Sequence, residues 1–462
     1  MSKRRVARVT LAAALVAGLT QGVPAQSVAE HAGLVLSSNR PAVVEPGRVA
    51  SIYQQYIDPV DGMTPDDLVR YALANNGELS AARQMVAEAR GRLRQAGLRP
   101  NPMIEASGSR AFNTPDNTQE FGAELPLELG GRRDARQAVA EREIELRQAE
   151  VADFERRLAA EVRMKYAAAI SAARNLKFTE DLLSLTRDSH RIVQARVERG
   201  KTAPLDQNLL QVELSRIDSM RIGLQSRAEV AVFEIKKVIG MPANQPIRLR
   251  GEFGVEQQPA SIEDSIRYAL SRRPDLNAAR AAEAVASAQI EQARRDGKLD
   301  ASIFANYMRQ SMGFDVRGFN SAGALAPVQG IFHFATFGVR LTLPVRNRNE
   351  GLIEAAVANA DAARARREFA EKVVRNEVTA AYARFVHARL ALEMYRDNVH
   401  EQALRNLGVI HQTYVLGQKS VLDYLGEQRR FIEVETGYTE VLKELLESLI
   451  EIERAAGSAT SV

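Results

Sequence analysis

Two segments of the chain alternate strictly between apolar and polar positions, and each leads directly into a very long helical pattern. In residues 337–348, FGVRLTLPVRNR, apolar side chains occupy every second position. Residues 121–132, FGAELPLELGGR, show the same alternation. A period of two is typical of a strand with one apolar and one polar face. Each segment therefore predicts a strand that launches a helix.

The helical segments that follow are unusually long. No glycine or proline occurs from Arg132 to Arg199 or from Leu352 to Leu407, and Ala, Glu, Arg and Leu dominate both stretches. These residue types favour helices. At 1.5 Å of rise per residue, such helices would reach about 80–100 Å. Helices of this length must pack along one another as in a coiled coil, so the pattern predicts a mainly α protein.

The second half of the chain repeats the first. LVRYALANNGELSAAR (68–83) matches SIRYALSRRPDLNAAR (265–280), and Leu125-Pro126-Leu127 matches Leu343-Pro344-Val345. Further along, three pairs align: Tyr166 with Tyr382, Gly200 with Gly417, and Asp206 with Asp423. An internal repeat of this kind predicts two copies of one structural unit. Each copy would contain a short helix, a helix, a strand, a loop, a strand, a long helix, a turn and a helix.

The expected boundaries follow from this alignment. The first repeat covers residues 64–250, with strands at about 102–112 and 118–129, a long helix at about 131–199 and a helix at about 203–239. The second repeat covers residues 260–457, with strands at about 301–310 and 334–345, a long helix at about 349–416 and a helix at about 420–456. Residues 311–333, rich in Gly and Ser, would form an external loop.

The N-terminus has the pattern of an export signal. Residues 1–25 combine a basic end, an apolar run from Val9 to Leu19 and the small-residue sequence Val23-Pro24-Ala25, which is typical of a signal peptide. A short N-terminal membrane anchor is the alternative. Residues 26–63 are polar and irregular. Beyond residue 25 no run of about 18 apolar residues remains, so a membrane location would require a closed β-barrel.

Composition removes several classes of function. The chain has 62 basic and 58 acidic residues, and its four basic residues before Ala25 account for the formal charge of +4. The mature chain is thus nearly neutral, which gives no electrostatic reason to expect nucleic-acid binding. The absence of cysteine excludes disulfides, thiolate metal ligands, a thiol nucleophile and a lipid anchor on cysteine, so we expect a protein that is not a lipoprotein.

Four strand-like segments distinguish the chain from a helical rod. Each has about ten residues, the length of a tilted strand that crosses an outer membrane. Alternation alone would also fit a soluble sheet. The export signal and the aromatic residues near the strand ends favour a barrel, which two hairpins cannot close without further copies of the chain. Glu120, Glu124 and Arg340 would line its lumen; on the soluble alternative they lie on a solvated face.

The sequence contains no recognisable catalytic constellation. The histidines lack a chelating spacing such as i, i+4, and neither a phosphate-binding loop nor a GxSxG sequence is present. We therefore expect no enzymatic activity, no cofactor and no metal site, with the histidines in structural or surface roles. The six histidines are His31, His190, His333, His387, His400 and His411.

Taken together, these features resemble the TolC-like outer-membrane efflux proteins over nearly the whole mature chain. The resemblance rests on the tandem repeat, on the launches LPLELGGRR and LPVRNRNEG, and on the paired turns GKTAPLDQ and GQKSVLDY. Residues 97–105, GLRPNPMIE, together with the Glu-Leu-Gly-Gly launch, are most similar to the CzcC-like heavy-metal efflux branch.

The resemblance implies a homotrimer in the outer membrane of a Gram-negative bacterium. Four strands per protomer would form one twelve-stranded barrel in contact with lipid, continued by an α-helical barrel in the periplasm. The implied function is a passive exit duct for heavy-metal cations, working with a periplasmic adaptor (a membrane fusion protein) and an inner-membrane pump of the RND type. Drug efflux or type I protein secretion is the alternative within the family, and a structural coiled-coil envelope protein is the alternative outside it.

The resemblance also assigns roles to the two helical turns. Asp423, Asp206, Tyr414 and Lys419 would form a periplasmic aperture, with Tyr414–Asp206 and Lys419 near Leu205 as tethers of a closed state. The turns at Gly200, Leu205 and Gly417 would contact the adaptor. Two of these acids also have a purely structural interpretation. Ser420-Val421-Leu422-Asp423 fits a capping box, and Asp206 fits the first helical turn after Pro204; both roles are compatible.

Overall fold

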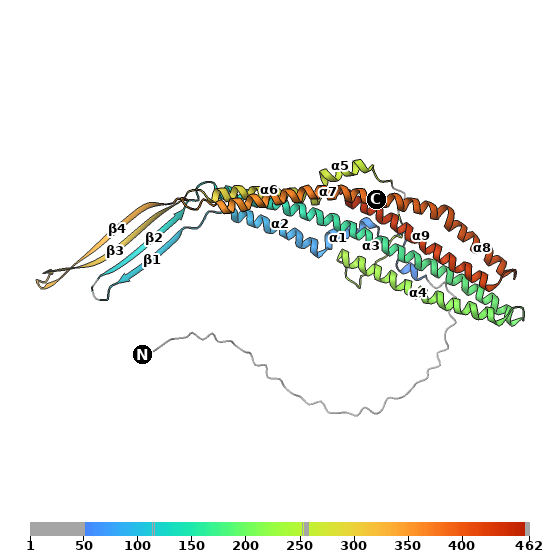
Figure 1. Ribbon diagram of the computed structural model, residues 1–462. Helices are drawn as coiled ribbons and strands as arrows, with labels where there is room; N and C mark the ends of the chain where they lie inside the picture. The colour runs from blue at the N-terminus through green and yellow to red at the C-terminus, as the bar shows by residue number, and fades with distance from the viewer. Residues whose placement is uncertain (1–50, 113, 115, 252, 254–257, 458–462) are drawn as a thin grey trace, which may run out of the picture. The chain divides into compact units, whose positions relative to one another are not determined.

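Long α-helices lie side by side through most of the structure (Figure 1). The computed structural model describes residues 51–112, 114, 116–251, 253 and 258–457. All belong to Ala50–Val462, one of the two units into which the chain divides. The predicted signal peptide, residues 1–25, and residues 26–50 of the irregular segment lie outside this description. Within the described part, no helix is both long and apolar enough to cross a membrane.

Both halves contain corresponding elements in the same order, with α7, η2 and α8 in the second half at the place of α3 in the first. After a 3-10 helix η1 (Ile52–Gln55), the first half comprises α1 (Pro65–Asn75), α2 (Gly77–Ala96), β1 (Met103–Arg110), β2 (Asn117–Pro126), α3 (Arg132–Glu198) and α4 (Pro204–Ile239). The second half comprises α5 (Ile262–Arg272), α6 (Pro274–Asp296), β3 (Asp300–Phe319), β4 (Leu325–Thr342), α7 (Glu350–Met394), the π-helix η2 (Tyr395–His400), α8 (Glu401–Val415) and α9 (Val421–Ala456).

The transition from strand to helix depends on left-handed backbone conformations. The residue before α3 is Gly131, with φ of 74°, and the residue before α7 is Asn349, with φ of 68°. Glycine adopts this region freely, and asparagine is among the few other residues that tolerate it. The two launches noticed in the sequence therefore share one backbone geometry but reach it with different residues.

The repeats also share a joint at the N-termini of α2 and α6. Asn76 caps α2 by accepting a hydrogen bond from the Leu79 amide, and its side chain donates to the Val238 carbonyl of α4 at 2.9 Å. Arg273 occupies the matching position and donates to the Ala455 carbonyl of α9, also at 2.9 Å. In both halves, a side chain at the start of a shorter helix (α2 or α6) thus donates a hydrogen bond to the last long helix of that half (α4 or α9).

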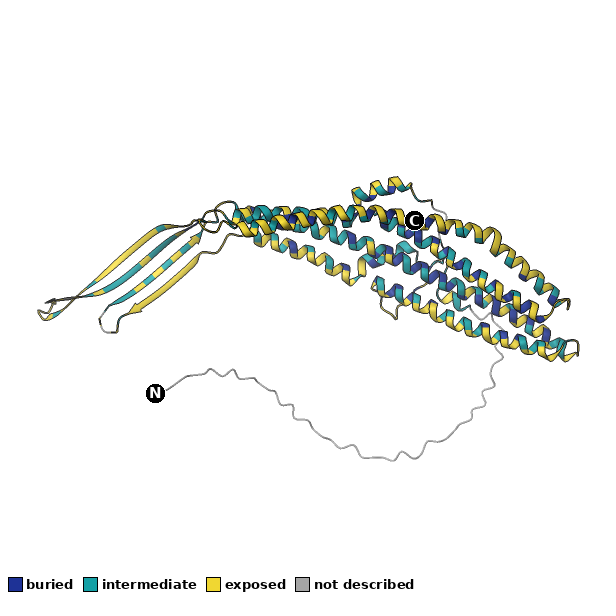
Figure 2. Cartoon of the chain, in the orientation of Figure 1, coloured by how far each residue is buried: buried dark blue, intermediate teal, exposed yellow. Residues whose placement is uncertain are grey.

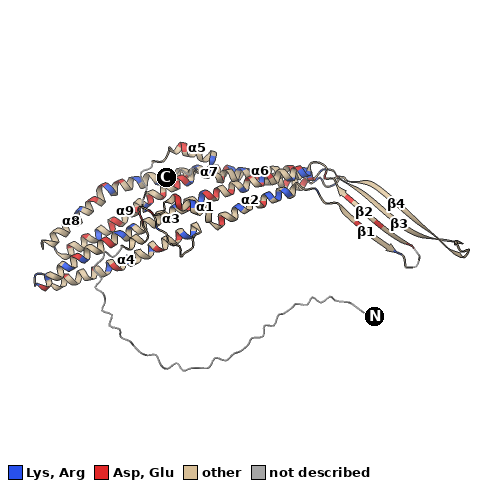
Figure 3. Ribbon diagram, turned by 180° about the vertical axis from the view of Figure 1, so that it is seen from behind, with Lys and Arg blue, Asp and Glu red and all other residues tan. Residues whose placement is uncertain are grey.

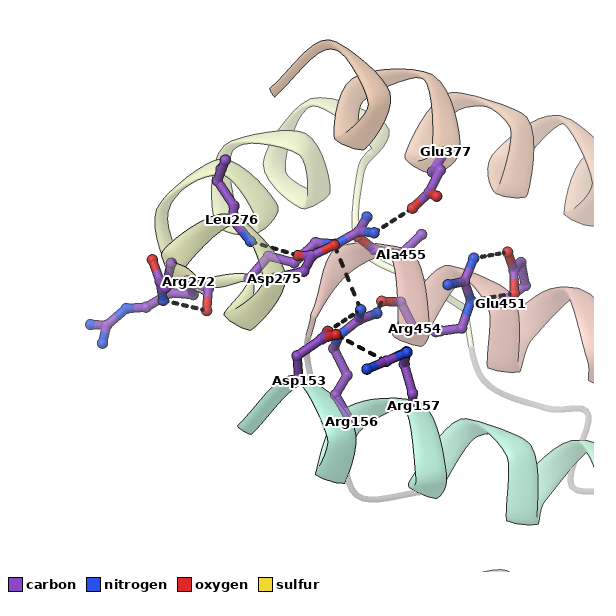
Figure 4. A network of polar contacts seen from close by, with 12 residues as sticks. Asp153, Arg156, Arg157, Arg272, Asp275, Leu276, Glu377, Glu451, Arg454 and Ala455 are labelled. Atoms are coloured by element: carbon purple, nitrogen blue, oxygen red, sulfur yellow. Dashed lines mark hydrogen bonds and ion pairs between the residues drawn. The ribbon is translucent and has the colours of Figure 1, made fainter. Parts of the chain in front are cut away.

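At the second of these joints the residue that makes the contact is itself charged and forms ion pairs. Arg273 is 2% exposed and pairs with Asp275 at 2.9 Å and with Glu377 of α7. Figure 4 shows the surrounding network, in which Arg156 of α3 joins Asp153, Asp275 and the backbone carbonyl of Arg454. A charged network holds α3, α6, α7 and α9 together at this point, where the first repeat uses a neutral amide.

The four strands form one antiparallel sheet in the order β1-β2-β3-β4. Glu124 of β2 is opposite Met103 of β1 and Phe304 of β3, and Phe304 is opposite Gly338 of β4. Hence each face is continuous across all four strands. Of the described sheet residues only Ala301 and Ser302 are buried, whereas buried residues are concentrated among the helices (Figure 2).

The second hairpin is longer than predicted. Residues 311–333 were expected to form a loop, but β3 extends to Phe319 and β4 begins at Leu325. Pairing continues from Ser311↔Ile331 to Phe319↔Leu325, with one irregularity between Phe314 and Arg317. Phe314, Val316 and Phe319 in β3 and Val328 and Ile331 in β4 are residue types that favour strands, so the segment forms a ribbon despite its glycines. At its other end β4 stops at Thr342, before Pro344, which lacks an amide hydrogen.

The second long helix is not continuous. The sequence predicted one helix over about 349–416, whereas the structure has α7, η2 and α8 in succession. No glycine or proline lies at this interruption. The two glycines of these helices are Gly351, in the first turn of α7, and Gly408, within α8. The chain is thus helical from Glu350 to Val415, and the π-helical segment at Tyr395–His400 within this helix was not predicted.

The helices bury two corresponding cores, one in each half. In the first, α1, α3 and α4 enclose residues that include Leu68, Val162 and Ile235. In the second, α5, α7 and α9 enclose residues that include Ala269, Val378 and Leu445. Residues 51–57 contribute to the first core, since Ile57 is buried there and the Ile52 amide donates to Glu180 of α3 at 3.0 Å.

Candidate functional site

The two helical turns come together in space. The α3–α4 turn and the α8–α9 turn enclose a cavity of about 460 Å³. Four of the residues predicted for the aperture and the turns line this cavity: Asp206, Tyr414, Gly417 and Lys419. Leu205 is beside Asp206 in the chain and is 63% exposed. The structure thus gathers most of the predicted turn residues around one space that both repeats share.

Glycine is required at both turns by backbone conformation. Gly200 has φ of 66° and Gly417 has φ of 78°. The next residue in each turn donates its amide back into the preceding helix, Lys201 to the Arg196 carbonyl and Gln418 to the Thr413 carbonyl, both at 2.9 Å. Such a left-handed residue after a helix is a common way to satisfy its last carbonyls. No other residue lies within 4 Å of a Cβ added at either glycine, so space does not impose the choice.

Asp423 has a clear structural role. Its amide donates to the Ser420 hydroxyl at 3.2 Å, and its carboxylate accepts from the Ser420 amide at 3.2 Å, which completes a capping box at the start of α9. These contacts with Ser420, and more weakly the charge of Lys419, lower the pKa of the exposed Asp423 carboxyl. Asp423 is therefore an ionised group held at a helix N-terminus beside the shared cavity.

Tyr414 is the most buried of the predicted aperture residues. It is 6% exposed, and its ring is stacked on Tyr424 with centroids 5.2 Å apart. Its hydroxyl is buried without a hydrogen-bond partner among the described residues. Burial, followed by the nearby Asp206 carboxylate, raises the Tyr414 pKa to about 12. Tyr414 and Asp206 therefore share the cavity, but the predicted tether between them is not hydrogen-bonded in this structure.

The contact that does join the two turns was not predicted. Arg196 of α3 donates from its guanidinium to the Val415 backbone carbonyl at the end of α8. About two turns earlier in α3, the Ser189 hydroxyl lies 3.4 Å from His411 Nε2 and 3.5 Å from the Tyr424 hydroxyl. A backbone carbonyl can belong to any residue, so the sequence contains no signal for the Arg196 contact.

The charged residues predicted for the barrel lumen lie on one face of the sheet. The Ser302 hydroxyl donates to Glu124 at 2.5 Å, and Arg340 forms an ion pair with the same carboxylate across β3. The Arg340 guanidinium also lies 5.4 Å from the centre of the Phe304 ring. Glu120 is four residues before Glu124 and therefore on the same face, opposite Ser107 and Met308.

The opposite face of the sheet is largely apolar and exposed in the half nearer the helices, and Arg110, Gln119, Arg309 and His333 lie on it farther along. Its side chains come from all four strands and include Ile104 (83% exposed), Phe121, Ile303, Phe337, Val339 and Leu341. Figure 3 shows charged residues along the helices and few on the strands. A sheet that exposes a large apolar face ordinarily requires another hydrophobic surface or lipid against it.

The histidines do not form a metal site in the part of the chain that the structure describes. No group of three His, Asp or Glu side chains there has an arrangement that would hold a metal ion. His400 contacts Glu435 and His411 contacts Ser189, whereas His31 lies outside the described residues. Among the described histidines, therefore, these two make specific contacts between helices.

Comparison with known proteins identifies the family. The model of the family described as outer membrane efflux protein matches residues 68–240 and 265–458, which correspond to the two repeats. The chain belongs to the outer membrane efflux protein family. The resemblance to TolC-like proteins is thereby confirmed.

Three similar proteins place the chain more closely within the outer membrane efflux proteins. It is 24% identical over 401 residues to the cobalt-zinc-cadmium resistance protein CzcC of Cupriavidus metallidurans, covering 86% of this chain and 90% of CzcC. It is 26% identical over 259 residues to the nickel-cobalt-cadmium resistance protein NccC of Alcaligenes xylosoxydans, covering 55% and 53%. The solved structure of CusC aligns with a TM-score of 0.68 at 19% identity, over 86% of this chain and 92% of CusC.

Membership of this family determines the class of activity. Outer membrane efflux proteins are channels rather than enzymes, and they lie in the outer membrane and extend into the periplasm. The alternative of a structural coiled-coil envelope protein is therefore set aside. The fold is the expected mainly helical one, with a four-stranded sheet in each chain.

Proposed function

We propose that three copies of this chain close one barrel and form the passive exit duct of a tripartite efflux system that exports heavy-metal cations. A periplasmic adaptor and an inner-membrane pump of the RND type would complete the system, and the pump would supply the energy. The duct itself needs no catalytic group, since its task is to provide a water-filled path across the outer membrane.

The observation that carries this proposal is the sheet. Its outer strands, β1 and β4, each pair on one side only within the described chain, and one face is apolar and exposed. Unpaired strand edges cannot remain in lipid, because each unsatisfied backbone group there costs several kcal/mol. Symmetric closure by further copies removes both edges at once. Three copies with four strands each give twelve strands, an even number, as bacterial barrels require.

The choice of heavy metals as cargo rests on the relatives. CzcC is named for resistance to cobalt, zinc and cadmium, and NccC for resistance to nickel, cobalt and cadmium. This chain aligns with CzcC over most of both lengths, which supports a shared system. Export of drugs or proteins would use the same duct with a different pump, and the experiment below separates metal export from drug export.

We assign the aperture and docking roles to the paired turns. In a trimer, three copies of Asp423 would form an acidic ring at the periplasmic end, with Asp206, Tyr414 and Lys419 around it. The exposed turns at Gly200, Leu205 and Gly417 would contact the adaptor. On the sheet, Glu120, Glu124 and Arg340 would line the lumen. The shared cavity, the exposure of the turns and the polar sheet face support these roles.

Two measurements test the proposal. Negative-stain electron microscopy of the detergent-solubilised protein should show hollow particles with three-fold symmetry, and rods without a detergent belt would contradict the barrel. A deletion strain should then become sensitive to cobalt, zinc, cadmium or nickel, and regain resistance with the wild-type gene. Sensitivity to lipophilic drugs alone, with unchanged metal tolerance, would assign the duct to drug efflux instead.

A further inference from the structure

The apolar face of the sheet ends at a definite level. Along β4, away from the helices (Figure 1), apolar side chains occupy this face at every second position from Leu341 to Ala335. Leu343 and Val345, both exposed, continue it at the helical end. The ten residue steps from Val345 to Ala335 give a height of about 25 Å, at about 3.3 Å per residue and a strand tilt of about 40°. The apolar band of an outer-membrane barrel has this height.

The rows beyond the apolar band are polar and basic. His333 of β4 is opposite Arg309 of β3, and Arg309 is opposite Gln119 of β2. One row farther from the helices, Arg110 of β1 is opposite Asn117. All four strands therefore change from apolar to polar side chains at nearly the same level. We call Arg110, Arg309 and His333 the basic edge.

No carboxylate of β1, β2 or β4 accompanies the basic edge. The three carboxylates of β1 and β2 lie on the opposite face of the sheet: Glu105, Glu120 and Glu124. β4 contains none. Arg110 is exposed and Arg309 half-buried, and neither makes a hydrogen bond or an ion pair with another described residue. Two guanidinium charges on this face are thus left without a partner in the described part of the chain.

The third member of the basic edge is held in place by a tyrosine. The Tyr307 hydroxyl lies 2.6 Å from His333 Nδ1, and the two ring centroids are 6.0 Å apart. A hydroxyl that donates to Nδ1 leaves the ring proton on Nε2. His333, which is exposed, can then donate a hydrogen bond from Nε2 even when its ring is neutral. A hydrogen-bond donor therefore lies directly beside Arg309 on the same face.

The position of these donors favours an anion at the membrane surface. A charged side chain facing hydrocarbon is costly, and long basic side chains reach toward the level of the lipid headgroups. The anions at that level are headgroup phosphates, which clusters of basic side chains bind. Arginine suits them because its planar guanidinium donates two parallel hydrogen bonds to one phosphate.

We propose that Arg110, Arg309 and His333 bind phosphate groups in the headgroup of an anionic lipid of the outer leaflet. Arg110 is two strand spacings and one row from Arg309, about 12 Å between their Cα atoms. That separation suits a headgroup with two phosphates better than one small anion. The inference rests on the proposed function, because it requires the apolar face to lie in lipid and the far end of the sheet to point out of the cell.

Native mass spectrometry of the detergent-solubilised protein tests this lipid site. The probe is lipid A with two phosphates, and the comparison is the same lipid after removal of its phosphates. Wild-type protein should bind the probe at least about tenfold more tightly, the scale of one charge-assisted hydrogen bond. The difference should shrink as the salt concentration rises. Equal affinity for the two lipids would overturn the proposal without any substitution. Inorganic phosphate that displaces the probe at equal concentration would show an anion site rather than a lipid site.

Substitutions then locate the site on the sheet. The double variant Arg110→Gln/Arg309→Gln removes both charges and should weaken binding of the probe at least about tenfold, with binding of the dephosphorylated lipid unchanged. Arg110→Lys/Arg309→Lys keeps the charges and should retain most of the affinity. Arg90→Gln/Arg94→Gln is the matched control, since it removes two exposed positive charges from α2. Wild-type affinity in the first variant, or equal losses in the first variant and the control, would overturn the role of the basic edge.

The outcomes separate the lipid site from the proposed function. Electron microscopy of the same preparations shows whether hollow particles with three-fold symmetry and a detergent belt are present. If they are present and lipid binding does not depend on phosphate, the lipid site fails and the duct stands. If wild-type protein forms rods without a detergent belt, the barrel itself fails and the lipid site fails with it.

Discussion

At the scale of single residues, two side chains at the turns combine a structural contact with an ionised carboxylate or a buried hydroxyl. Asp423 completes a capping box and remains ionised. Tyr414 is stacked on Tyr424, yet its hydroxyl lacks a partner among the described residues. A buried hydroxyl without a hydrogen bond costs stability, which makes Tyr414 a group whose role the folded core alone does not explain.

Replacing Asp423 by Ala separates its two roles. The capping box is lost, so we expect a small decrease in the melting temperature, and the exposed negative charge at the α8–α9 turn is lost as well. Asp67→Ala is the matched control, because Thr64 and Asp67 form an equivalent capping box at α1, away from the turns. In planar bilayers, Asp423→Ala should raise the basal conductance or lower the cation selectivity, and Asp67→Ala should not. Equal conductance in both variants would leave Asp423 as a cap only.

Tyr414→Phe tests the buried hydroxyl through pH. The Tyr414 pKa is raised from 10.0 to about 12, chiefly by burial, so the folded state favours the neutral phenol. Stability from this group is complete below pH 10 and is lost as the pH rises from about 10 to about 12. We expect Tyr414→Phe to be at least as stable as wild type at pH 7, and to lose less stability over that alkaline range. The measurement is thermal unfolding followed by circular dichroism at a series of pH values, and parallel curves for the two proteins would contradict it.

At the scale of elements, the sequence was informative where periodicity and composition decide the structure. The long helix expected at about 131–199 is Arg132–Glu198, because an uninterrupted run of strong helix formers leaves little alternative. The ribbon at residues 311–331 was not predicted, because its glycines favour a loop, whereas the strand-forming Phe314, Val316 and Phe319 lie between them. The composition of the segment does not indicate the π-helix η2. The only sign of it in the sequence is that Tyr382 and Gly417 are one position farther apart than Tyr166 and Gly200.

In the candidate site, too, some residues could be predicted from the sequence and others could not. The turn glycines and the acids after them were recognisable from the repeat, because their backbone conformations restrict the residue types. Arg196 and the joint at Arg273 were not recognisable. Both donate to backbone carbonyls of distant helices, and such contacts depend on how the helices pack rather than on any local pattern.

The charged joint should contribute substantially to stability. Arg273→Ala would leave Glu377 and Asp275 without their buried partner, and we expect a loss of about 2–3 kcal/mol, below the usual value for buried pairs because Glu377 remains one-third exposed. Arg272→Ala is the control, since its side chain is exposed on the neighbouring position. That control should change stability by less than about 0.5 kcal/mol. Similar midpoints in chemical denaturation for both variants would show that the network is dispensable.

At the scale of the whole molecule, the two faces of the sheet predict two environments. Glu120 and Phe121 are neighbours in β2 with side chains on opposite faces. With the protein in lipid vesicles, a membrane-impermeant, charged maleimide should react with Glu120→Cys and not with Phe121→Cys. The chain contains no other cysteine to complicate the result. Both cysteines should react once the protein is unfolded in detergent, and equal reaction in vesicles would mean that the apolar face is in water.

The ribbon beyond the first hairpin has a consequence for detecting the protein. Residues 312–331 pair only between β3 and β4, since β2 ends its pairing at Asn117↔Ser311. At the tip, the Asn320 side chain accepts from the amides of Ala322 and Ala324 and closes a turn that contains Gly323 with φ of 77°. A short antibody epitope inserted after Ala322 would lengthen this turn without disturbing the contacts of β1 or β2. We expect intact cells that carry it to bind the antibody, so that the copies of this chain displayed at the cell surface become countable by flow cytometry.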